Sequence, residues 1–387
     1  MTHRKISSLL AAGCSFIAMG GWMQPAFAVQ PDDQVLVALR PGVDPFDVLA
    51  SSRITTFAVS AVWRHAINGF AARIPHGSVV SLRHDSRVLV VEPDRGVTLA
   101  ASPSSWGLDR VDQHTLPLDK HYAPFADGSG VTAYVIDTGI RLSHHDFGGR
   151  ASSGADFVDG GSADDCQGHG THVAGTIGGT TYGVAPKVSL VAVRVMDCDG
   201  RGPTSQIISG VEWVQTHHEA GAPAVANLSL GGAPSAVLDQ AVRNLIDSGV
   251  TVVAAAGNGD ANGRAQSACD VSPARVHQVV TVSAVDATDY RAPWAGYGSC
   301  VDLFAPGVDI VSDGISSDST HKTMSGTSMA APHATGAAAL VLSQDPSATP
   351  SVVSERLRAS GTKSVVKDAR TSGPRLLFVG GGGGSSW

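Results

Sequence analysis

The sequence predicts an α/β protein with a mostly parallel sheet around a central buried helix, preceded by a small α+β segment. Four continuous apolar or β-branched runs alternate with segments of helical periodicity, and the alanine-rich stretch 334–342 carries no charge. Apolar strands that alternate with helices indicate a parallel sheet covered on both faces, with ligands at the carboxyl ends of its strands. An uncharged alanine-rich helix indicates an element that is buried on most sides.

The alternating strands and helices begin after about residue 130. The predicted strands are residues 131–136, 188–193, 224–228 and 250–254. The predicted helices between them are residues 172–178, 205–218 and 236–247. Each strand run is short and bounded by turn residues, which favours strand over buried helix.

The central helix follows a tight turn at residues 325–330 and is closed by Asp345 and Pro346. We expect Pro332 in its first turn, where the missing N–H costs little. Ser328 should then lie at the positive end of the helix, where free backbone N–H groups stabilise a developing oxyanion. A serine before such a helix is, however, most often a cap.

The segment from about residue 34 to 100 forms a small unit of its own. Residues 34–39 and 88–91 are predicted strands, and residues 43–52 and 77–84 have helical spacing. A linker of small residues, 100–105, follows and is of the kind that proteases cleave. The unit is therefore either an independent binding module or a pro-region removed after export.

The two ends of the chain have distinct compositions. The first 28 residues have the pattern of a secretory signal, with Arg4 and Lys5, a short apolar run and then Ala26-Phe27-Ala28. The apolar run is shorter than a membrane-spanning helix requires. We therefore expect a secreted protein, with the periplasm as transit or alternative, and no membrane partner. The predicted divisions are a signal peptide 1–28, a pro-region 29–101, a main domain 102–379 and a flexible Gly/Ser tail 380–387.

Charge and cysteine content narrow the function further. The net charge is −7 and the chain has no basic patch, so nucleic acid is not an expected partner, and we expect a monomer. Four cysteines remain once the signal peptide leaves, and an even number in an exported chain predicts two disulfides. Nearest-neighbour pairing closes two loops of similar size, but all three connectivities stay open. The four residues are Cys166, Cys198, Cys269 and Cys300.

Polar residues follow the predicted strands where chemistry is expected. Asp137 lies at the tip of the first strand, His169 at the start of a helix, Asn258 after the fourth strand and Ser328 before the central helix. A serine nucleophile needs a base, the base needs a carboxylate to fix its tautomer, and the tetrahedral oxyanion needs donors. These four residues can supply the four roles.

The motifs around these residues resemble the three signatures of the subtilisin family, in the order Asp, His, Ser. They are Asp137-Thr138-Gly139, His169-Gly170-Thr171-His172 and Gly326-Thr327-Ser328-Met329-Ala330. A finer resemblance, to the proteinase K-like branch, is carried by residues 165–169, 193–198 and 227–232. The resemblance spans Trp106 to about Val379 and implies a subtilisin-like three-layer α/β sandwich.

The resemblance also implies a mechanism and a substrate. Asp137 would orient His169, His169 would act as general base and then acid on Ser328, and Asn258 with the Ser328 N–H would form the oxyanion hole. Protein or peptide substrates would pair as an added strand between two segments, which favours broad specificity. Small, uncharged pocket walls would favour large apolar or aromatic side chains. The segments and walls are Gly200-Arg201-Gly202, Ser229-Leu230-Gly231 and Ala255-Ala256-Gly257.

Three further expectations rest on the same resemblance. A calcium-binding loop would use oxygen ligands, which suit Ca²⁺, although His121 departs from the oxygen donor expected there. A second calcium site would use Asp302 with backbone carbonyls, and the alternative is an acidic surface turn. The first site comprises Asp109, Asp112, Gln113 and Asp119. Residues 34–100 would be the inhibitory pro-region, which binds its own enzyme before maturation and assists folding.

The sequence therefore predicts a secreted serine endopeptidase made as an autoprocessed zymogen. One alternative is a catalytically silent binding protein on the same fold, but the four site residues are intact. A serine esterase is a second alternative, although the serine lacks the Gly-x-Ser-x-Gly context. A zinc site at His169 and His172, with Asp165 and Cys166 nearby, is a third reading that the other two signatures disfavour.

Overall fold

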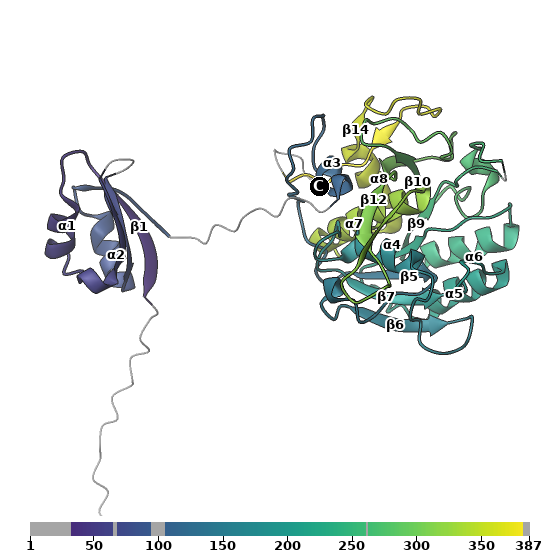
Figure 1. Ribbon diagram of the computed structural model, residues 1–387, viewed down its shortest axis with the longest axis horizontal. Helices are drawn as coiled ribbons and strands as arrows, with labels where there is room; N and C mark the ends of the chain where they lie inside the picture. The colour runs from purple at the N-terminus through teal and green to yellow at the C-terminus, as the bar shows by residue number, and fades with distance from the viewer. Residues whose placement is uncertain (1–31, 65–67, 94–104, 261, 382–387) are drawn as a thin grey trace, which may run out of the picture. The chain divides into compact units, whose positions relative to one another are not determined.

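The computed structural model describes residues 32–64, 68–93, 105–260 and 262–381. The chain divides into two compact units, residues 1–99 and 100–387 (Figure 1). The predicted signal peptide, most of the predicted linker and residues 382–387 lie outside the described residues. No helix in the described ranges is both long enough and apolar enough to span a membrane.

The amino-terminal unit is an antiparallel sheet with two α-helices. Its strands lie in the order β2-β3-β1-β4. They are β1 (Asp33–Leu39), β2 (Val59–Trp63), β3 (Gly69–Ile74) and β4 (Val88–Pro93), with α1 (Pro45–Ser51), a short 3₁₀ turn η1 (Thr56–Ala58) and α2 (His76–Arg83). The sequence predicted β1, β4 and both α-helices but not β2 or β3.

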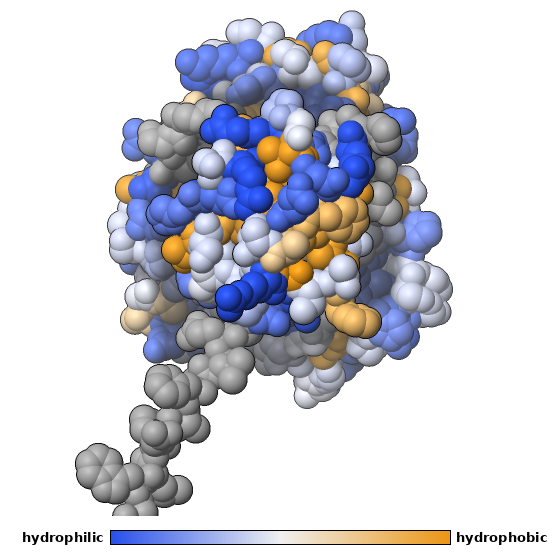
Figure 2. All heavy atoms as spheres, turned by 90° about the vertical axis from the view of Figure 1, so that its left-hand side faces the viewer, coloured by the Kyte–Doolittle hydropathy of each residue, from blue (hydrophilic) through white to orange (hydrophobic). Residues whose placement is uncertain are grey.

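One face of the amino-terminal sheet is packed and other parts of this unit expose apolar side chains. Val37, Phe70 and Leu82 are buried in its core. Leu89 and Val90 of β4 are exposed instead. Figure 2 shows hydrophobic residues gathered on the face of this unit that is turned to the viewer.

The second unit is built on a nine-stranded sheet in the order β14-β15-β11-β10-β9-β8-β5-β7-β6. All its strand pairs are parallel except β14 with β15. The strands are β5 (Thr132–Asp137), β6 (Ala151–Asp156), β7 (Ser189–Arg194), β8 (Ala224–Leu228), β9 (Thr251–Ala255), β10 (Val280–Val285), β11 (Leu303–Pro306), β14 (Thr362–Lys363) and β15 (Arg375–Leu376). A separate hairpin joins β12 (Ile310–Asp313) to β13 (His321–Met324).

Helices cover both faces of this sheet, as the sequence predicted. They are α3 (Trp106–Val111), η2 (His145–Phe147), α4 (His169–Gly178), α5 (Thr204–His217), α6 (Ala236–Asp247), η3 (Ala268–Asp270), α7 (Thr327–Gln344) and α8 (Pro350–Ser360). Alternate residues of β5 enter two cores: Ala133 and Val135 join the core with α4 and α7, whereas Tyr134 and Ile136 join the core with α5 and α6. Figure 1 shows the sheet between these helix pairs.

The central helix α7 corrects one expectation. Its helical residues begin at Thr327, so Pro332 lies inside the helix and not in its first turn. A proline there leaves the carbonyl four residues earlier without its helical donor. That carbonyl belongs to Ser328, and it accepts a hydrogen bond from Ser229 Oγ at 2.8 Å instead. Because Pro332 has no N–H, the Ser328 carbonyl is available to Ser229, and this hydrogen bond joins the segment around Ser229 to the start of α7.

The end of the chain also differs from expectation. Gly380 and Gly381 were assigned to the flexible tail, but Gly380 is buried and pairs with Pro124. The Gly381 N–H donates to the Ala123 carbonyl at 3.0 Å. A Cβ on Gly380 would approach the Asp112 carbonyl oxygen to 2.3 Å, so this close packing needs glycine. Composition alone could not distinguish packed glycines from mobile ones.

Candidate active site

Asp137 and His169 meet at the carboxyl edge of the sheet. Asp137 ends β5, and its side chain is fully buried. His169 begins α4, and its Nδ1 lies 2.7 Å from Asp137 Oδ1. The same carboxylate oxygen accepts the Thr138 N–H at 2.8 Å. This contact fixes the imidazole with Nδ1 towards the carboxylate and leaves Nε2 as the proton acceptor.

Opposing effects set the pKa of His169. Burial alone would lower this pKa, but the charge of Asp137 and its hydrogen bond raise it, and Asp165 adds to the rise. The positive charge of Lys322 acts in the opposite direction. The net pKa lies above the usual value for histidine. His169 therefore becomes a free base at a higher pH than an isolated histidine does.

Asp165 holds the first turn of α4 in place. Its Oδ1 accepts the Gly168 N–H at 2.9 Å and the Thr138 hydroxyl at 3.0 Å. Its Oδ2 accepts the Thr171 N–H at 2.9 Å. A carboxylate that accepts the free N–H groups of a helix start stabilises that start. Asp165 therefore couples the end of β5 to the helix that carries His169, a role that sequence reasoning did not assign.

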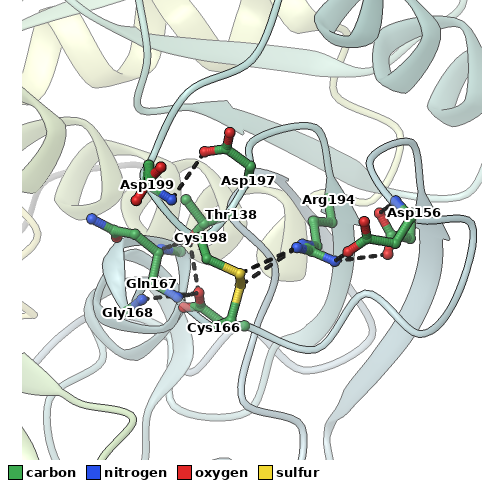
Figure 3. Close-up of a disulfide and its surroundings, with 12 residues drawn as sticks. Thr138, Asp156, Cys166, Gln167, Gly168, Arg194, Asp197, Cys198 and Asp199 are labelled. Carbon is green, nitrogen blue, oxygen red and sulfur yellow. Dashed lines mark hydrogen bonds and ion pairs between the residues drawn. A yellow bond between two sulfur atoms is a disulfide. The ribbon is translucent and has the colours of Figure 1, made fainter.

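A disulfide joins the segment before α4 to the segment after β7. Cys166 and Cys198 are bonded, and Arg194 Nη2 lies 3.4 Å from the Cys166 sulfur (Figure 3). Nη1 of the same arginine donates to Asp156 at 2.9 Å, as Figure 3 also shows. The second bond joins Cys269 to Cys300. Both are the nearest-neighbour pairs.

Ser328 lies in the first turn of α7, at the amino-terminal end that the sequence indicated. Its hydroxyl donates to the Ser229 carbonyl at 3.0 Å. Within the described residues, no hydrogen bond joins Ser328 to His169. Hydrogen bonds of catalytic groups are often long or misaligned before substrate binds, so this arrangement does not separate the two residues functionally.

Asn258 and Ser328 present two N–H donors to one small space. Asn258 Oδ1 accepts both the Thr327 N–H at 2.7 Å and the Thr327 hydroxyl at 2.8 Å, which leaves Nδ2 free to face outward. A Cβ placed on Gly326 would lie 3.4 Å from Asn258 Nδ2 and 3.5 Å from Ser328 N. Both donors therefore border the same point, and only glycine leaves it open. Thr327, which orients the amide, was not predicted from the sequence.

A pocket lies beside this donor pair. Its volume is about 240 Å³, and none of its lining residues is charged. Of the predicted walls, Leu230, Gly231, Ala255 and Gly257 line it, whereas Ser229 and Ala256 do not. The complete lining is Leu230, Gly231, Gly232, Ala255, Gly257, Asn258, Gly259, Gln266, Val271, Thr327 and Ser328. Gln266 and Val271 come from a loop that carries no sequence signal for this role.

The predicted substrate segment around Arg201 is held in place by two hydrogen bonds to Asp197. The Arg201 N–H donates to Asp197 Oδ1 at 2.9 Å, and its carbonyl accepts the Asp197 N–H at 2.8 Å. Neighbouring residues of an extended chain alternate in direction. The Gly202 N–H and the carbonyls of Gly200 and Gly202 form no hydrogen bond within the described residues, so they remain open for pairing.

The imidazoles of His169 and His172 point to different partners, which contradicts a zinc site between them. His169 faces Asp137, whereas His172 Nε2 lies 2.9 Å from the Ile310 carbonyl. Burial lowers the pKa of His172 to about 4 and keeps it neutral. No group of three or more His, Cys, Asp or Glu side chains in the described ranges is arranged to hold a metal ion.

The predicted calcium loop contains carboxylate oxygens without donors. Oδ1 of Asp109 and Oδ1 of Asp112 are buried and unpaired. Burial, with the charges of Asp119 and Asp109, raises the pKa of Asp112 to about 6. Gln113 closes the loop, because its Oε1 accepts the Asp119 N–H at 3.1 Å. The unpaired oxygens of Asp109 and Asp112 suit a hard cation, although no third acidic side chain in the described ranges is arranged with them around one point.

Asp302 does not fit the second calcium site that was expected. Its Oδ1 accepts a hydrogen bond from Arg358 Nη1 at 3.0 Å, and its Oδ2 accepts the Thr281 N–H at 2.9 Å. Both oxygens are thus already engaged, one of them by a cation from α8. A guanidinium in this position takes the electrostatic place of a metal ion, which corrects the expectation.

Known proteins with this fold match most of the chain. Residues 128–375 match the model of the subtilase family of peptidases. An extracellular serine proteinase of Thermus sp. (strain Rt41A) is 51% identical over 349 residues, which cover 88% of this chain and 83% of the relative. Alkaline serine exoprotease A of Vibrio alginolyticus is 46% identical over 357 residues, with 89% and 65% covered.

Solved structures agree with the sequence relatives. The crystal structure of a cold adapted subtilisin-like serine proteinase superposes with a TM-score of 0.68 at 50% identity. The superposition covers 72% of this chain and 99% of that chain. This chain therefore belongs to the subtilase family and is a serine endopeptidase.

Proposed function

We propose that Asp137, His169 and Ser328 form the catalytic triad of a secreted serine endopeptidase. The observation that carries the proposal is the 2.7 Å contact between His169 Nδ1 and the buried Asp137 carboxylate, at the sheet edge where α7 presents Ser328. His169 Nε2 takes the Ser328 proton as the hydroxyl oxygen attacks the scissile carbonyl, and later gives it to the leaving amine. Asp137 stabilises the imidazolium that forms in between.

The tetrahedral oxyanion binds between Asn258 Nδ2 and the Ser328 N–H. Both nitrogens border the space that Gly326 leaves open, and Thr327 prevents the Asn258 amide from turning over. The start of α7 adds its dipole and unpaired N–H groups at the same place. Charge that develops in the transition state is therefore met by donors already in position.

Peptide substrates bind as an extended strand with a large side chain in the pocket. Open backbone groups at Gly200 and Gly202 support strand pairing on one side, and the 229–231 segment lies next to Ser328 on the other. Backbone pairing tolerates many sequences, which favours broad specificity. The uncharged pocket of about 240 Å³ favours large apolar or aromatic residues before the scissile bond.

The chain matures from a zymogen. Its amino-terminal residues form a compact unit with a hydrophobic core of their own. We assign it as the pro-region, 29–101, which inhibits and assists its own peptidase unit until the same active site cleaves the linker. The peptidase domain then comprises residues 102–381, with the packed Gly380 and Gly381 included, and the signal peptide, 1–28, directs export.

Calcium stabilises the mature enzyme at the loop formed by Asp109, Asp112, Gln113 and Asp119. The two unpaired buried carboxylate oxygens support this proposal. The ion neutralises carboxylates that otherwise repel one another and lose hydration. Its role is structural, because this loop lies outside the group of side chains around Ser328.

The decisive experiment replaces the nucleophile and a neighbouring serine separately. Ser328→Ala should abolish casein hydrolysis and leave a full zymogen that retains residues 29–101, as intact mass shows. Ser325→Ala is the matched control, because Ser325 lies in the same turn but bonds Asp309. It should mature and hydrolyse casein. Retained hydrolysis by Ser328→Ala would refute the triad, and its processing in a protease-free host would refute autoprocessing alone.

The same preparation separates the remaining alternatives. A serine-directed phosphonate should add one adduct to the wild-type enzyme, on Ser328, and stop casein hydrolysis. A silent binding protein would take no adduct, and an esterase would hydrolyse ester substrates while leaving casein intact.

A further inference from the structure

The hairpin of β12 and β13 packs against the helix that carries His169. His172 Nε2 lies 2.9 Å from the Ile310 carbonyl, and Ser312 Oγ donates to the His172 carbonyl at 2.9 Å. A Cβ on Gly168, directly before His169, would lie 3.3 Å from the Ile315 side chain. β13 then continues within four residues to Ser328. The hairpin thus connects the two halves of the proposed triad.

Lys322 lies on the side of this hairpin that faces α4. It pairs directly with Ser312 across the hairpin. Side chains of directly opposite residues in an antiparallel pair share one face. Because Ser312 Oγ bonds the α4 backbone, Lys322 projects from the same face and, being exposed, reaches solvent beside His169. The Coulomb effect of Lys322 on His169 agrees with this placement.

No acidic side chain in the described residues neutralises Lys322 by an ion pair. Of the acids in the hairpin, Asp313 is fully buried, and Asp318 is bonded by Arg141 Nε at 2.6 Å and by the Ser143 hydroxyl at 2.6 Å. The carboxylates that face His169 are Asp137 from β5 and Asp165 from the loop before α4, and both are buried in their own networks. Lys322 is therefore a free cation at the edge of the active site.

The position of β13 assigns this cation to the leaving-group side. The pocket for the acyl half is lined by residues 230–232, 255, 257–259, 266, 271 and 327–328, and by none from β12 or β13. An extended substrate that fills this pocket crosses Ser328 and continues away from it. β13 ends at Met324, four residues before Ser328, and contributes nothing to this pocket, so we infer that the hairpin borders the path of the leaving half.

We propose that Lys322 selects substrates with an acidic side chain at the first or second residue after the scissile bond. The proposal rests on the proposed triad and adds a determinant of substrate choice to it. The ammonium group attracts a carboxylate of the leaving half without burying it. The preference for glutamate over glutamine should be roughly three- to fivefold in kcat/KM, the size expected for one solvated charge pair about 4 Å apart.

Two quenched peptides test the selectivity. They differ only in Glu or Gln at the second residue after the scissile bond, and the Glu-to-Gln ratio of kcat/KM is measured for each enzyme. Lys322→Gln should lower this ratio by roughly three- to fivefold, whereas Lys322→Arg should keep it. Lys363→Gln, on the exposed β14 at the far end of the sheet order, should leave it unchanged.

Salt and pH provide independent readouts. The preference should shrink between about 0.01 M and about 1 M salt, as the Debye length falls from roughly 30 Å to roughly 3 Å. With a neutral peptide, the acid limb of kcat/KM should move to higher pH in Lys322→Gln, because the charge that lowers the pKa of His169 is removed. The other charges on His169, those of Asp137 and Asp165, are unchanged.

Distinct results would overturn the proposal. An unchanged Glu-to-Gln ratio in Lys322→Gln would refute selectivity, even if the acid limb moved, since Lys322 would then act on His169 alone. An equal loss in Lys363→Gln would show a general charge effect and refute it as well. None of these outcomes touches the triad, which the Ser328→Ala and phosphonate experiments test separately.

Discussion

Replacing the buried Asp313 with asparagine should make the enzyme more stable at alkaline pH. Asp313 ends β12, its side chain is fully buried, and neither of its carboxylate oxygens has a hydrogen-bond donor. Burial and the adjacent carboxylate of Asp146 raise its pKa to about 8. His144 Nδ1 lies 3.6 Å from Asp313 Oδ1 but already accepts the Asp146 N–H. The folded protein must therefore either protonate Asp313 or keep the negative carboxylates of Asp313 and Asp146 in contact.

The pKa shift fixes the sign and the size of the effect. The folded pKa is raised above the unfolded value, which is about 3.9, so the folded state binds the extra proton between about pH 4 and about pH 8. Stability falls as pH rises through this window. Asparagine can donate to Asp146 without binding a proton. Its advantage should grow by about 2 to 4 kcal/mol between about pH 5 and about pH 9, at about 1.4 kcal/mol per pKa unit.

Thermal unfolding measures this difference directly. The mature enzyme is first inactivated with a serine-directed phosphonate to prevent self-digestion, and unfolding is followed by circular dichroism at one scan rate. Asp313→Asn should raise the midpoint by about 5 °C or more relative to wild type at about pH 9, and by clearly less at about pH 5. Asp127→Asn is the control, because Lys187 and Ser129 lower the pKa of Asp127 to about 2.

The two variants should respond to pH in opposite ways. Asp127 contributes stability above its unfolded pKa, and that contribution is lost as pH falls towards about 2. Asp127→Asn should therefore lower the unfolding midpoint slightly at alkaline pH and raise it at neither pH value. An Asp313→Asn variant that shifts the midpoint equally at both pH values, or lowers it at alkaline pH, would show that Asp313 is not a buried carboxyl under strain.

Four further changes test the site and its supports. Asn258→Ala should lower kcat by roughly 10²–10³ with little change in KM, and an effect on KM alone would remove it from the oxyanion hole. Gly326→Ala fits sterically but places a methyl group between the two donors, so kcat should fall by roughly tenfold or more while the unfolding midpoint stays near wild type. Chelation with EDTA should lower the unfolding midpoint of the wild type but not that of Asp112→Asn; equal sensitivity would refute calcium binding at this loop. Reduction of the Cys269–Cys300 bond should lower the inactivation temperature, because each bridge stabilises by roughly 3–4 kcal/mol, without blocking hydrolysis in the cold; loss of cold activity would contradict a purely structural role.

Periodicity alone placed the central strands and helices of the peptidase unit closely. The predicted strand 224–228 is β8, and the predicted helix 236–247 is α6, residue for residue. These elements are buried runs or strongly amphipathic helices, so the local pattern and the tertiary packing agree. β2 (Val59–Trp63) and β3 (Gly69–Ile74) of the amino-terminal unit escaped prediction because both strands are short and neither shows a regular alternation of apolar and polar residues.

The family and the order of its signatures followed from the sequence by itself, because catalytic chemistry restricts which residues can occupy a few short motifs. The sequence also placed Asp137, His169 and Ser328 at strand or helix ends, since the chain direction of each element fixes its ends. Local patterns contain this information, and neighbouring residues along the chain suffice to read it.

Tertiary structure alone decided which charges meet. Asp146 and Asp313 are far apart in the sequence, and so are Asp302 and Arg358, yet each pair is in contact in the folded chain. Coulomb and desolvation energies depend on distance and burial, neither of which a one-dimensional pattern specifies. For this reason the sequence predicted calcium at Asp302, where the fold places an arginine, and gave no sign that Lys322 stands beside His169.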